Sequence, residues 1–510
     1  MEVRLISNIA HLLWKTASAR AALPAVLEGG RVTDYATLQR RAAAIGAALT
    51  ASGFKVHDRV GIFLDGGADA IAAFFGVVAA GGIAVVINES LRPRQVEHIL
   101  EASGATTLIT SEDLLSRQPR QLETRTHLLL APMLEDLLPV TFTPLPRLGM
   151  DPAQIVFTSG STGLPKGVTV THGNLLAAAQ TVIGYLGIAA TDRIASVLPF
   201  SFVYGMSQVL CAVGSGAALV VARSPLASQL VTELRAQQVS VLAAVPPLWQ
   251  QFLNVSSFRD EPLRSLRLVT NAGGHLPVPV VRALRRAQPQ ARLFLMYGLT
   301  EVLRSTFLPP EEVDRRPDSI GRAIPGAEVL VLRDDLTPCE PGEVGELVHR
   351  GPTVTLGYWN DPEETARVFR PHPLRAAGTP DTERVVFSGD LVRQGADGWL
   401  YFVGRSQRMI KTLGYRISPD EIGTVLYASG EVAECIITSE PDDARGERIV
   451  AFVVLAGGGS LDRLRTYVGV ELPRHMQPAR YEVRDALPRL PSGKHDVAAL
   501  RGEQRQGAWT

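Results

Sequence analysis

Apolar residues follow two different spacings along the first part of the chain. Between Tyr35 and Leu49 they repeat at offsets of three and four, which predicts an amphipathic helix ended by Gly53. Residues 60–64 and 83–87 are short apolar runs that flank a helix-like stretch over 68–80. Strand, helix, strand is the repeating unit of a parallel sheet, so this region predicts a buried α/β core.

The same alternation continues for most of the chain. A helix is predicted over 96–102 and a strand over 106–109. Further buried strands are predicted at the apolar runs 217–221, 239–244, 266–270 and 292–296. We therefore expect a large N-terminal α/β domain over residues 1–404, with layered sheets and helices and with two related sheets.

The pattern changes after Gly404. Ser418 and Pro419 form a helix start, with Ser as the N-cap, Pro in the first position and Glu421 three residues after the cap. Apolar runs at 432–437 and 449–455 and a helix near 461–468 follow. These elements predict a small α+β C-terminal domain over 409–510, joined to the large domain by a hinge at 405–408.

Composition excludes several classes of protein. The 510 residues carry 51 Lys plus Arg and 51 Asp plus Glu, so no basic surface for nucleic acid is expected. The three cysteines are far apart and have no metal-ligand spacing. The most apolar window, 68–87, is split by Gly81 and Gly82, which favours a buried core segment over a membrane span. No signal peptide is recognised, and a cytoplasmic protein is expected.

The most informative motif is IVFTSGSTGLPKGV at 155–168. Its glycines let the backbone approach phosphate oxygens, while its hydroxyls and Lys166 supply donors and positive charge. The spacing fits neither a Walker A loop nor the elbow of an α/β hydrolase. The alternative is a flexible loop without a ligand. The residues predicted to bind phosphate are Thr158, Ser159, Gly160, Ser161, Thr162, Gly163 and Lys166.

This loop resembles the phosphate-binding signature of the adenylate-forming superfamily, which includes acyl-CoA synthetases, nonribosomal peptide synthetase adenylation domains and luciferases. Further segments resemble the other signatures of that superfamily and occur in the expected order. They are Asn271-Ala272-Gly273-Gly274, Tyr297-Gly298-Leu299-Thr300-Glu301, Ser388-Gly389-Asp390, Gly404-Arg405, the run 410–417 and Pro491-Ser492-Gly493-Lys494. The resemblance spans nearly the whole chain.

The resemblance implies roles for residues of the large domain. Tyr297 would stack on adenine, which suits a flat ring, with 271–274 as the wall beside the base. Thr300 would contact the α-phosphate, and Glu301 would bind Mg²⁺ together with phosphate oxygens. Asp390 would accept hydrogen bonds from the ribose hydroxyls, with Arg405 beside it.

The resemblance also implies roles for residues of the small domain and of the hinge. Lys494 would bridge the attacking carboxylate and the α-phosphate, where its ammonium offsets the charge that gathers in the transition state. Lys411 and Gly414 would lie on the face presented for a second, thioester-forming step. Gln407 stands at the hinge position where the family usually has Asp or Lys. Hinge residues need only absorb backbone rotation, so rotation of the domain is still expected.

The implied activity is that of an AMP-forming acid–thiol ligase. It would use ATP and Mg²⁺ to make an acyl-adenylate, then pass the acyl group to coenzyme A. The alternatives are transfer to the phosphopantetheine of a separate carrier protein, and a non-catalytic nucleotide-binding member of the fold. The nearest likeness is to stand-alone bacterial acyl-CoA ligases of biosynthetic clusters, including the exosortase-associated group.

The segment 198–205, LPFSFVYG, resembles the lining of the acyl pocket. Phe202 stands where many acyl-CoA synthetases have His, and Val203, Tyr204 and Met206 add apolar surface, although all four could be ordinary core residues. No acidic residue occurs between Asp192 and Glu233, and an unpaired buried ammonium is costly. An apolar acyl or aryl acid is therefore expected rather than an α-amino acid.

Overall fold

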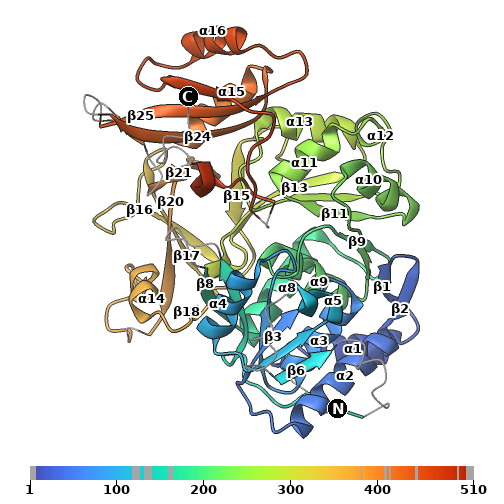
Figure 1. Cartoon of the computed structure of the whole chain (residues 1–510). Coiled ribbons are helices and arrows are strands. Elements are labelled where there is room, and N and C mark those ends of the chain that lie inside the picture. The colour runs from blue at the N-terminus through green and yellow to red at the C-terminus, as the bar shows by residue number, and fades with distance from the viewer. Residues whose placement is uncertain are drawn as a thin grey trace.

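The computed structural model describes residues 7–117, 127–130, 141–158, 165–380, 382–406, 410–412, 415–442, 446–490 and 493–500. A large α/β body carries a small domain that lies over one end of it (Figure 1). The expected fold class, a large α/β domain followed by a small α+β domain, is confirmed.

One sheet of the large domain is built mainly from the first 171 residues. Its order is β18-β8-β7-β4-β3-β5-β6. The neighbours from β6 to β7 pair in parallel, and β7, β8 and β18 pair antiparallel. The strands are β3 (Arg59–Phe63), β4 (Ile83–Val86), β5 (Thr107–Thr110), β6 (His127–Leu130), β7 (Pro152–Thr158), β8 (Lys166–Thr171) and β18 (Gly357–Tyr358). The predicted strands at 60–64, 83–87 and 106–109 are confirmed.

The second sheet repeats this plan and then extends it. Its parallel part has the order β13-β12-β11-β9-β10-β1, with β2 antiparallel at the edge. The strands are β1 (Pro24–Glu28), β2 (Arg31–Asp34), β9 (Arg193–Ser196), β10 (Ala218–Val221), β11 (Val241–Ala244), β12 (Leu268–Asn271) and β13 (Arg292–Tyr297). Four of these are the apolar runs predicted as buried strands, and all four are confirmed.

Antiparallel strands continue this sheet beyond β13 in the order β14-β15-β21-β20-β17-β16, with β19 on β20. Hydrophobic spacing alone did not predict these strands. They are β14 (Thr306–Leu308), β15 (Ser319–Ala323), β16 (Glu328–Leu332), β17 (Val344–Arg350), β19 (Phe369–Pro371), β20 (Arg384–Gln394) and β21 (Leu400–Arg405).

Helices cover the sheets of the large domain. Those before residue 120 are α1 (His11–Arg20), α2 (Tyr35–Ala51), α3 (Ala68–Ala79), α4 (Pro93–Ser103) and α5 (Glu112–Ser116). The later ones are α8 (His172–Leu186), α9 (Val203–Ser215), α10 (Ala227–Ala236), α11 (Pro246–Leu253), α12 (Ser256–Arg259), α13 (Val278–Ala287), the 3₁₀ turn η1 (Thr300–Val302) and α14 (Pro362–Val368). The helices expected at 35–49, 68–80 and 96–102 are α2, α3 and α4.

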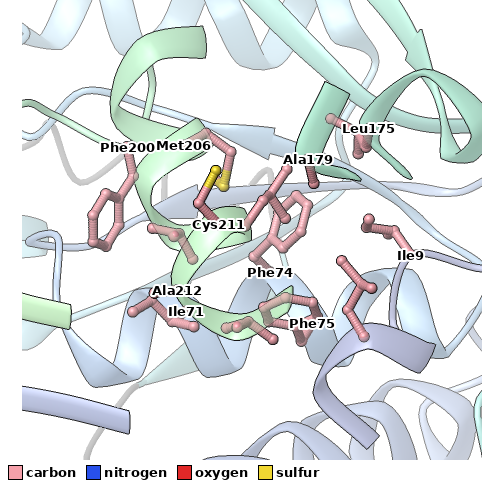
Figure 2. Packing of buried hydrophobic residues seen from close by; sticks show 14 of the residues in the cluster. Ile9, Ile71, Phe74, Phe75, Leu175, Ala179, Phe200, Met206, Cys211 and Ala212 are labelled. Atoms are coloured by element: carbon pink, nitrogen blue, oxygen red, sulfur yellow. The ribbon is translucent and has the colours of Figure 1, made fainter. Parts of the chain in front are cut away.

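The main core lies between α3, α8 and α9. Phe74 and Phe75 on α3 are fully buried and meet edge to face, 5.3 Å between ring centroids. Figure 2 shows them packed among Cys211 and Ala212 of α9 and residues of α8. The apolar window 68–87 is thus a buried core segment, as predicted. The helices that the structure describes are all too short or too polar to cross a bilayer.

The small domain has one five-stranded sheet with helices packed on it. Ser418 caps the first helix, because its side chain accepts from the Glu421 N–H, as the sequence predicts. That helix lies against α13 and β21 of the large domain. The elements are β22 (Ile410–Thr412), β23 (Tyr415–Ile417), α15 (Pro419–Ala428), β24 (Val432–Asp442), β25 (Gly446–Leu455), α16 (Leu461–Glu471) and β26 (Arg480–Val483).

A buried carboxylate ties three segments of the second sheet together. The Asp192 side chain, 3% exposed, accepts from Arg267 Nε (2.7 Å), the Ala189 N–H (2.8 Å) and Ser240 Oγ (2.8 Å). Burial alone would raise the pKa of Asp192, but these hydrogen bonds outweigh it and lower the pKa below its ordinary value.

We expect Asp192→Asn to reduce the free energy of unfolding at neutral pH by on the order of 2 kcal/mol, because Arg267 loses its counter-charge. Since the folded pKa is depressed, this stabilisation is present above the unfolded pKa and is lost as pH falls through the folded pKa. Urea unfolding from pH 7 to pH 3 checks this. Asp260→Asn, which removes an exposed Asp–Arg pair, is the control and should change little. Equal losses at pH 7 and pH 3 would contradict the prediction.

Candidate active site

The predicted nucleotide residues lie at the carboxyl ends of parallel strands. Thr158 ends β7, Asn271 ends β12, and Tyr297 ends β13. β12 and β13 are neighbours, with Asn271 opposite Leu295. In open α/β sheets this edge is where ligands bind, because the loops that follow the strands converge there. Asn271 and Tyr297 therefore end neighbouring strands of the second sheet, whereas Thr158 ends a strand of the first sheet.

Asp390 is the buried charge at the centre of this site. Its side chain is 1% exposed; it accepts from the Tyr297 hydroxyl at 2.5 Å and pairs with Arg405 Nε at 2.8 Å. Asp390 on β20 stands directly opposite Arg405 on β21, so the ladder sets this pair. Burial raises the pKa of Asp390 although Arg405 and Tyr297 favour the charged form. Residues of three predicted motifs therefore meet here.

The Tyr297 ring lies near two other rings. It stacks on His349 at 6.0 Å between centroids and 22° between planes, and Phe402 lies 6.4 Å away. Burial raises the pKa of the Tyr297 hydroxyl well above its usual range. His349 Nδ1 lies 2.6 Å from Ser305 Oγ, and burial lowers the pKa of His349 to about 3, so it is neutral. Sequence reasoning missed His349, which no motif marks.

Glu301, the predicted Mg²⁺ ligand, is positioned by a residue that the motifs did not reveal. The Tyr358 hydroxyl donates to Glu301 Oε1 at 2.5 Å, and the Thr355 N–H donates to the Glu301 carbonyl at 3.0 Å. No group of three or more His, Cys, Asp or Glu side chains that could hold a metal occurs among the described residues. A single carboxylate still fits magnesium, which keeps waters and binds phosphate oxygens.

Lys166 lies on the same side of the site as Tyr358. Its ammonium is 3.2 Å from Asp361, 3.6 Å from Glu364 and 5.8 Å from the centroid of the Tyr358 ring. These carboxylates on and before α14 hold the lysine at the start of β8, where it pairs with Thr158 of β7. The segment 357–364, whose Tyr and acidic residues could have been noticed in the sequence, completes this part of the site.

Lys494 of the small domain reaches the large domain. A Cβ built on Gly273 would lie 3.3 Å from Lys494 Cε and 3.8 Å from its Nζ. Gly273 has φ +81°, a conformation that favours glycine, and it follows β12 in the 271–274 segment. The C-terminal part of the chain, dark red in Figure 1, reaches from the small domain towards the large domain near β15 and β21. Two motifs from opposite ends of the predicted series therefore meet.

Some predicted residues lie outside the described part of the chain. These are the loop residues Ser159, Gly160, Ser161, Thr162 and Gly163, the hinge residue Gln407, and Gly414. The backbone of Lys411 belongs to β22, opposite Arg416. Gly298 and Leu299 lead from β13 into η1, which contains Thr300 and Glu301.

Two of the four predicted acyl-pocket residues line a cavity. Val203 and Met206, on α9, face it together with residues of α8 and β7. Tyr204 is buried beside the cavity and its hydroxyl donates to the Thr270 carbonyl at 2.8 Å, while Phe202 precedes the helix. Arg304 also lines this cavity and was not predicted.

A large α/β domain with the predicted nucleotide residues at its strand ends, and a small domain docked on it, is the arrangement of an adenylate-forming enzyme. Residues 13–359 match the family described as AMP-binding enzyme, and residues 421–494 match the AMP-binding enzyme C-terminal domain. The chain belongs to the AMP-binding enzyme family, and the predicted resemblance to the adenylate-forming superfamily is confirmed.

The curated relatives include peptide synthases that are much longer than this chain and a biosynthesis protein of similar length. A linear gramicidin synthase of Brevibacillus parabrevis is 32% identical over 93% of the chain, which spans 9% of that protein's length. Novobiocin biosynthesis protein H of Streptomyces niveus is 30% identical over 97% of the chain and 82% of its own length.

Similar solved structures are coenzyme A ligases. The o-succinylbenzoate CoA synthetase of Bacillus subtilis, solved with its acyl-adenylate, has a TM-score of 0.84 and 26% identity, covering 96% of this chain and 97% of its own. A benzoate CoA ligase from Burkholderia xenovorans LB400 has a TM-score of 0.86 and 25% identity, covering 97% and 99%. The anthranilate CoA ligase AuaEII has a TM-score of 0.90 and 24% identity over 98% of each chain, a likeness of fold.

We expect Tyr358→Phe to raise the Mg²⁺ concentration needed for half-maximal nucleotide-dependent activity roughly 10-fold, because Glu301 loses the donor that orients it. The measurement is a Mg²⁺ titration of acid-dependent pyrophosphate release at saturating ATP. Tyr481→Phe in β26 of the small domain is the matched control. An unchanged titration for Tyr358→Phe would show that the hydrogen bond to Glu301 has no part in metal binding.

Proposed function

We propose that this protein is an AMP-forming acid–thiol ligase that activates a carboxylic acid with Mg²⁺-ATP and transfers the acyl group to coenzyme A. The observation that carries the proposal is the position of Lys494, whose side chain lies across Gly273 at the nucleotide wall. A cation from a separate domain at this wall suits a reaction that gathers negative charge at the α-phosphate.

The first half-reaction follows from the placement of the charged groups. ATP would lie along the strand ends, with its adenine against Tyr297 and its ribose hydroxyls on Asp390. Lys166 and the 158–163 loop would hold the outer phosphates. Glu301 would hold Mg²⁺, which offsets phosphate charge. The acid carboxylate then attacks the α-phosphorus, pyrophosphate leaves, and Lys494 stabilises the charge that develops on the transferring phosphoryl group.

The second half-reaction needs a different position of the small domain relative to the large domain. Lys494 occupies the wall at Gly273, so it must withdraw before a thiol can use that side. Rotation at 405–408 would remove it and present the face that carries Lys411 and Gly414. The thiolate then attacks the acyl carbonyl, and AMP leaves. Arg405 begins this hinge and is paired with Asp390, so nucleotide contacts adjoin the pivot.

Two acceptors are consistent with the comparisons. Stand-alone coenzyme A ligases among the solved structures support coenzyme A. The nonribosomal peptide synthetase relatives support a carrier-protein phosphopantetheine as the second candidate. A third candidate is a nucleotide-binding member without catalysis. Such a protein would not need Lys494 or Glu301, and both are present in this chain.

Substitution of Lys494 or Lys411 tests which half-reaction each lysine serves. We expect Lys494→Ala to lower acid-dependent pyrophosphate release by roughly 100-fold or more, because one aimed charge is lost from the adenylation step. Lys494→Ala should still convert a synthetic acyl-adenylate and coenzyme A to the thioester. Lys411→Ala, the matched control, should keep pyrophosphate release and lose thioester formation.

A panel of fatty, aryl and amino acids, assayed with coenzyme A or with a phosphopantetheinylated carrier protein, identifies the acceptor. A thioester with coenzyme A supports the ligase, and pyrophosphate release with acyl transfer only to the carrier supports the second candidate. If neither protein variant differs from wild type, the assigned roles are wrong. If no acid drives pyrophosphate release in wild type, the enzyme proposal fails.

A further inference from the structure

An arginine without a counter-charge is buried in the wall of the acyl cavity. Arg304 is 5% exposed. Its Nη1 donates to the Leu303 carbonyl at 3.3 Å. Its Nε and Nη2 are buried and meet no hydrogen-bond acceptor among the described residues, and no described carboxylate lies within ion-pair distance. Arginine stays charged in proteins, so this site holds a buried cation with two unused donors.

Arg304 directly follows a strained turn at the edge of the cavity. Leu303, which also lines the cavity, has φ +54° and ψ −56°, a conformation that a branched residue adopts at a cost of about 1–3 kcal/mol. The turn follows Glu301 directly, and the Thr353 hydroxyl holds the Arg304 carbonyl at 3.1 Å. A buried residue three positions from the predicted metal ligand thus lines the same cavity as Val203 and Met206.

The guanidinium is also fixed in place from one side. Its central carbon lies 4.9 Å from the centroid of the Tyr204 ring, a favourable cation–π distance. Tyr204 is anchored by its hydroxyl bond to Thr270 on β12. This contact leaves the Nε and Nη2 donors without a partner among the described residues.

No other described side chain that lines the cavity accepts from these donors. Its lining is mostly aliphatic and comes from β7, α8 and α9, with Gln154 and Ser207 as the other polar residues. Figure 2 shows Met206 of α9 and Leu175 and Ala179 of α8 on one side of the core built around Phe74 and Phe75. Burying an unpaired cation among such residues costs several kcal/mol, so the site is poised for an anion.

We propose that Arg304 binds a second carboxylate on the acid that the enzyme activates, so that the substrate is a dicarboxylic acid, either an aliphatic diacid or an aryl acid bearing a further carboxylate. This rests on the proposed acid–thiol ligase function and names its substrate class. One carboxylate would face the α-phosphate near Lys494. The other would take the two unused donors of Arg304, in the bidentate geometry that suits arginine.

The proposal revises the expectation of a wholly apolar acid. The cavity has a volume of about 20 Å³, so its aliphatic side chains must move apart to admit the acid. They would then contact an apolar middle section of the substrate, and its far end would meet the Arg304 cation. The same cation explains, together with the lack of acidic residues between Asp192 and Glu233, why an α-ammonium group would be repelled from this pocket.

Matched acids test the proposal with the full-length wild-type protein. Each pair shares a carbon skeleton and differs in one carboxylate: hexanoate with adipate, butyrate with succinate, and each methylbenzoate with the benzenedicarboxylate that has the same ring positions. The measurement is kcat/KM for pyrophosphate release, with mass spectrometry of the acyl-adenylate. We expect at least one diacid to exceed its monoacid partner by roughly 100-fold or more, because a site built around a charged donor rejects a substrate that lacks the acceptor.

Variants at Arg304 separate recognition from folding. Arg304→Met keeps much of the side-chain volume and should lower kcat/KM for the preferred diacid by roughly 100-fold while leaving or raising that of the monoacid. Arg304→Lys keeps the positive charge but loses the planar, two-donor guanidinium. Its kcat/KM for the preferred diacid should lie between the values of the wild type and of Arg304→Met. Arg282→Met, at an exposed position on α13, is the matched control. Thermal melting confirms that each variant folds.

The outcomes distinguish this inference from the function on which it rests. If monoacids are activated as well as their diacid partners, and Arg304→Met lowers both equally, then Arg304 is structural and the inference fails while the ligase stands. If no acid of either kind drives pyrophosphate release in wild type, the proposed function itself fails and the inference falls with it.

Discussion

The site depends on one buried carboxylate. Asp390 joins the end of the parallel sheet, through Tyr297, to the last strand before the small domain, through Arg405. A carboxylate at this depth is tolerable only because two donors face it, and each donor comes from a different strand of the sheet. The antiparallel extension from β14 to β21 therefore does more than lengthen the sheet. It carries the partner of Tyr297 and ends at the position where the chain passes into the small domain.

The proposed ligase function adds a second constraint, because one wall would have to serve two reactions. Lys494 lies across Gly273 because a glycine with positive φ leaves no side chain in the way. A side chain at Gly273 would crowd the lysine, and a lysine fixed there would crowd the incoming thiol. A small domain with its own core, joined by a short hinge, resolves the conflict because it can move as a unit. The proposed ligase chemistry uses this property.

The proposed acyl side of the site combines charge with shape. The Arg304 guanidinium lies over the Tyr204 ring within mostly aliphatic walls. In such surroundings an unpaired guanidinium is unfavourable, and a substrate that supplies its counter-charge gains affinity from relieving that penalty. The strained turn at Leu303 is consistent with a local arrangement kept for binding rather than for stability.

The sequence by itself determined the class of fold, many of the parallel strands and their helices, and the segments that resemble nucleotide motifs, because hydrophobic spacing, caps and glycine-rich turns act over a few residues. It led to the α2–β3–α3–β4 unit, the cap at Ser418 and the family. Only the tertiary structure decided which distant side chains meet. Tyr358 reaches Glu301 across 57 residues, and Lys494 reaches Gly273 from another domain. Arg304 is the clearest case: its charge is plain in the sequence, but its burial without a counter-charge depends on packing contributed by β7, α8 and α9 together.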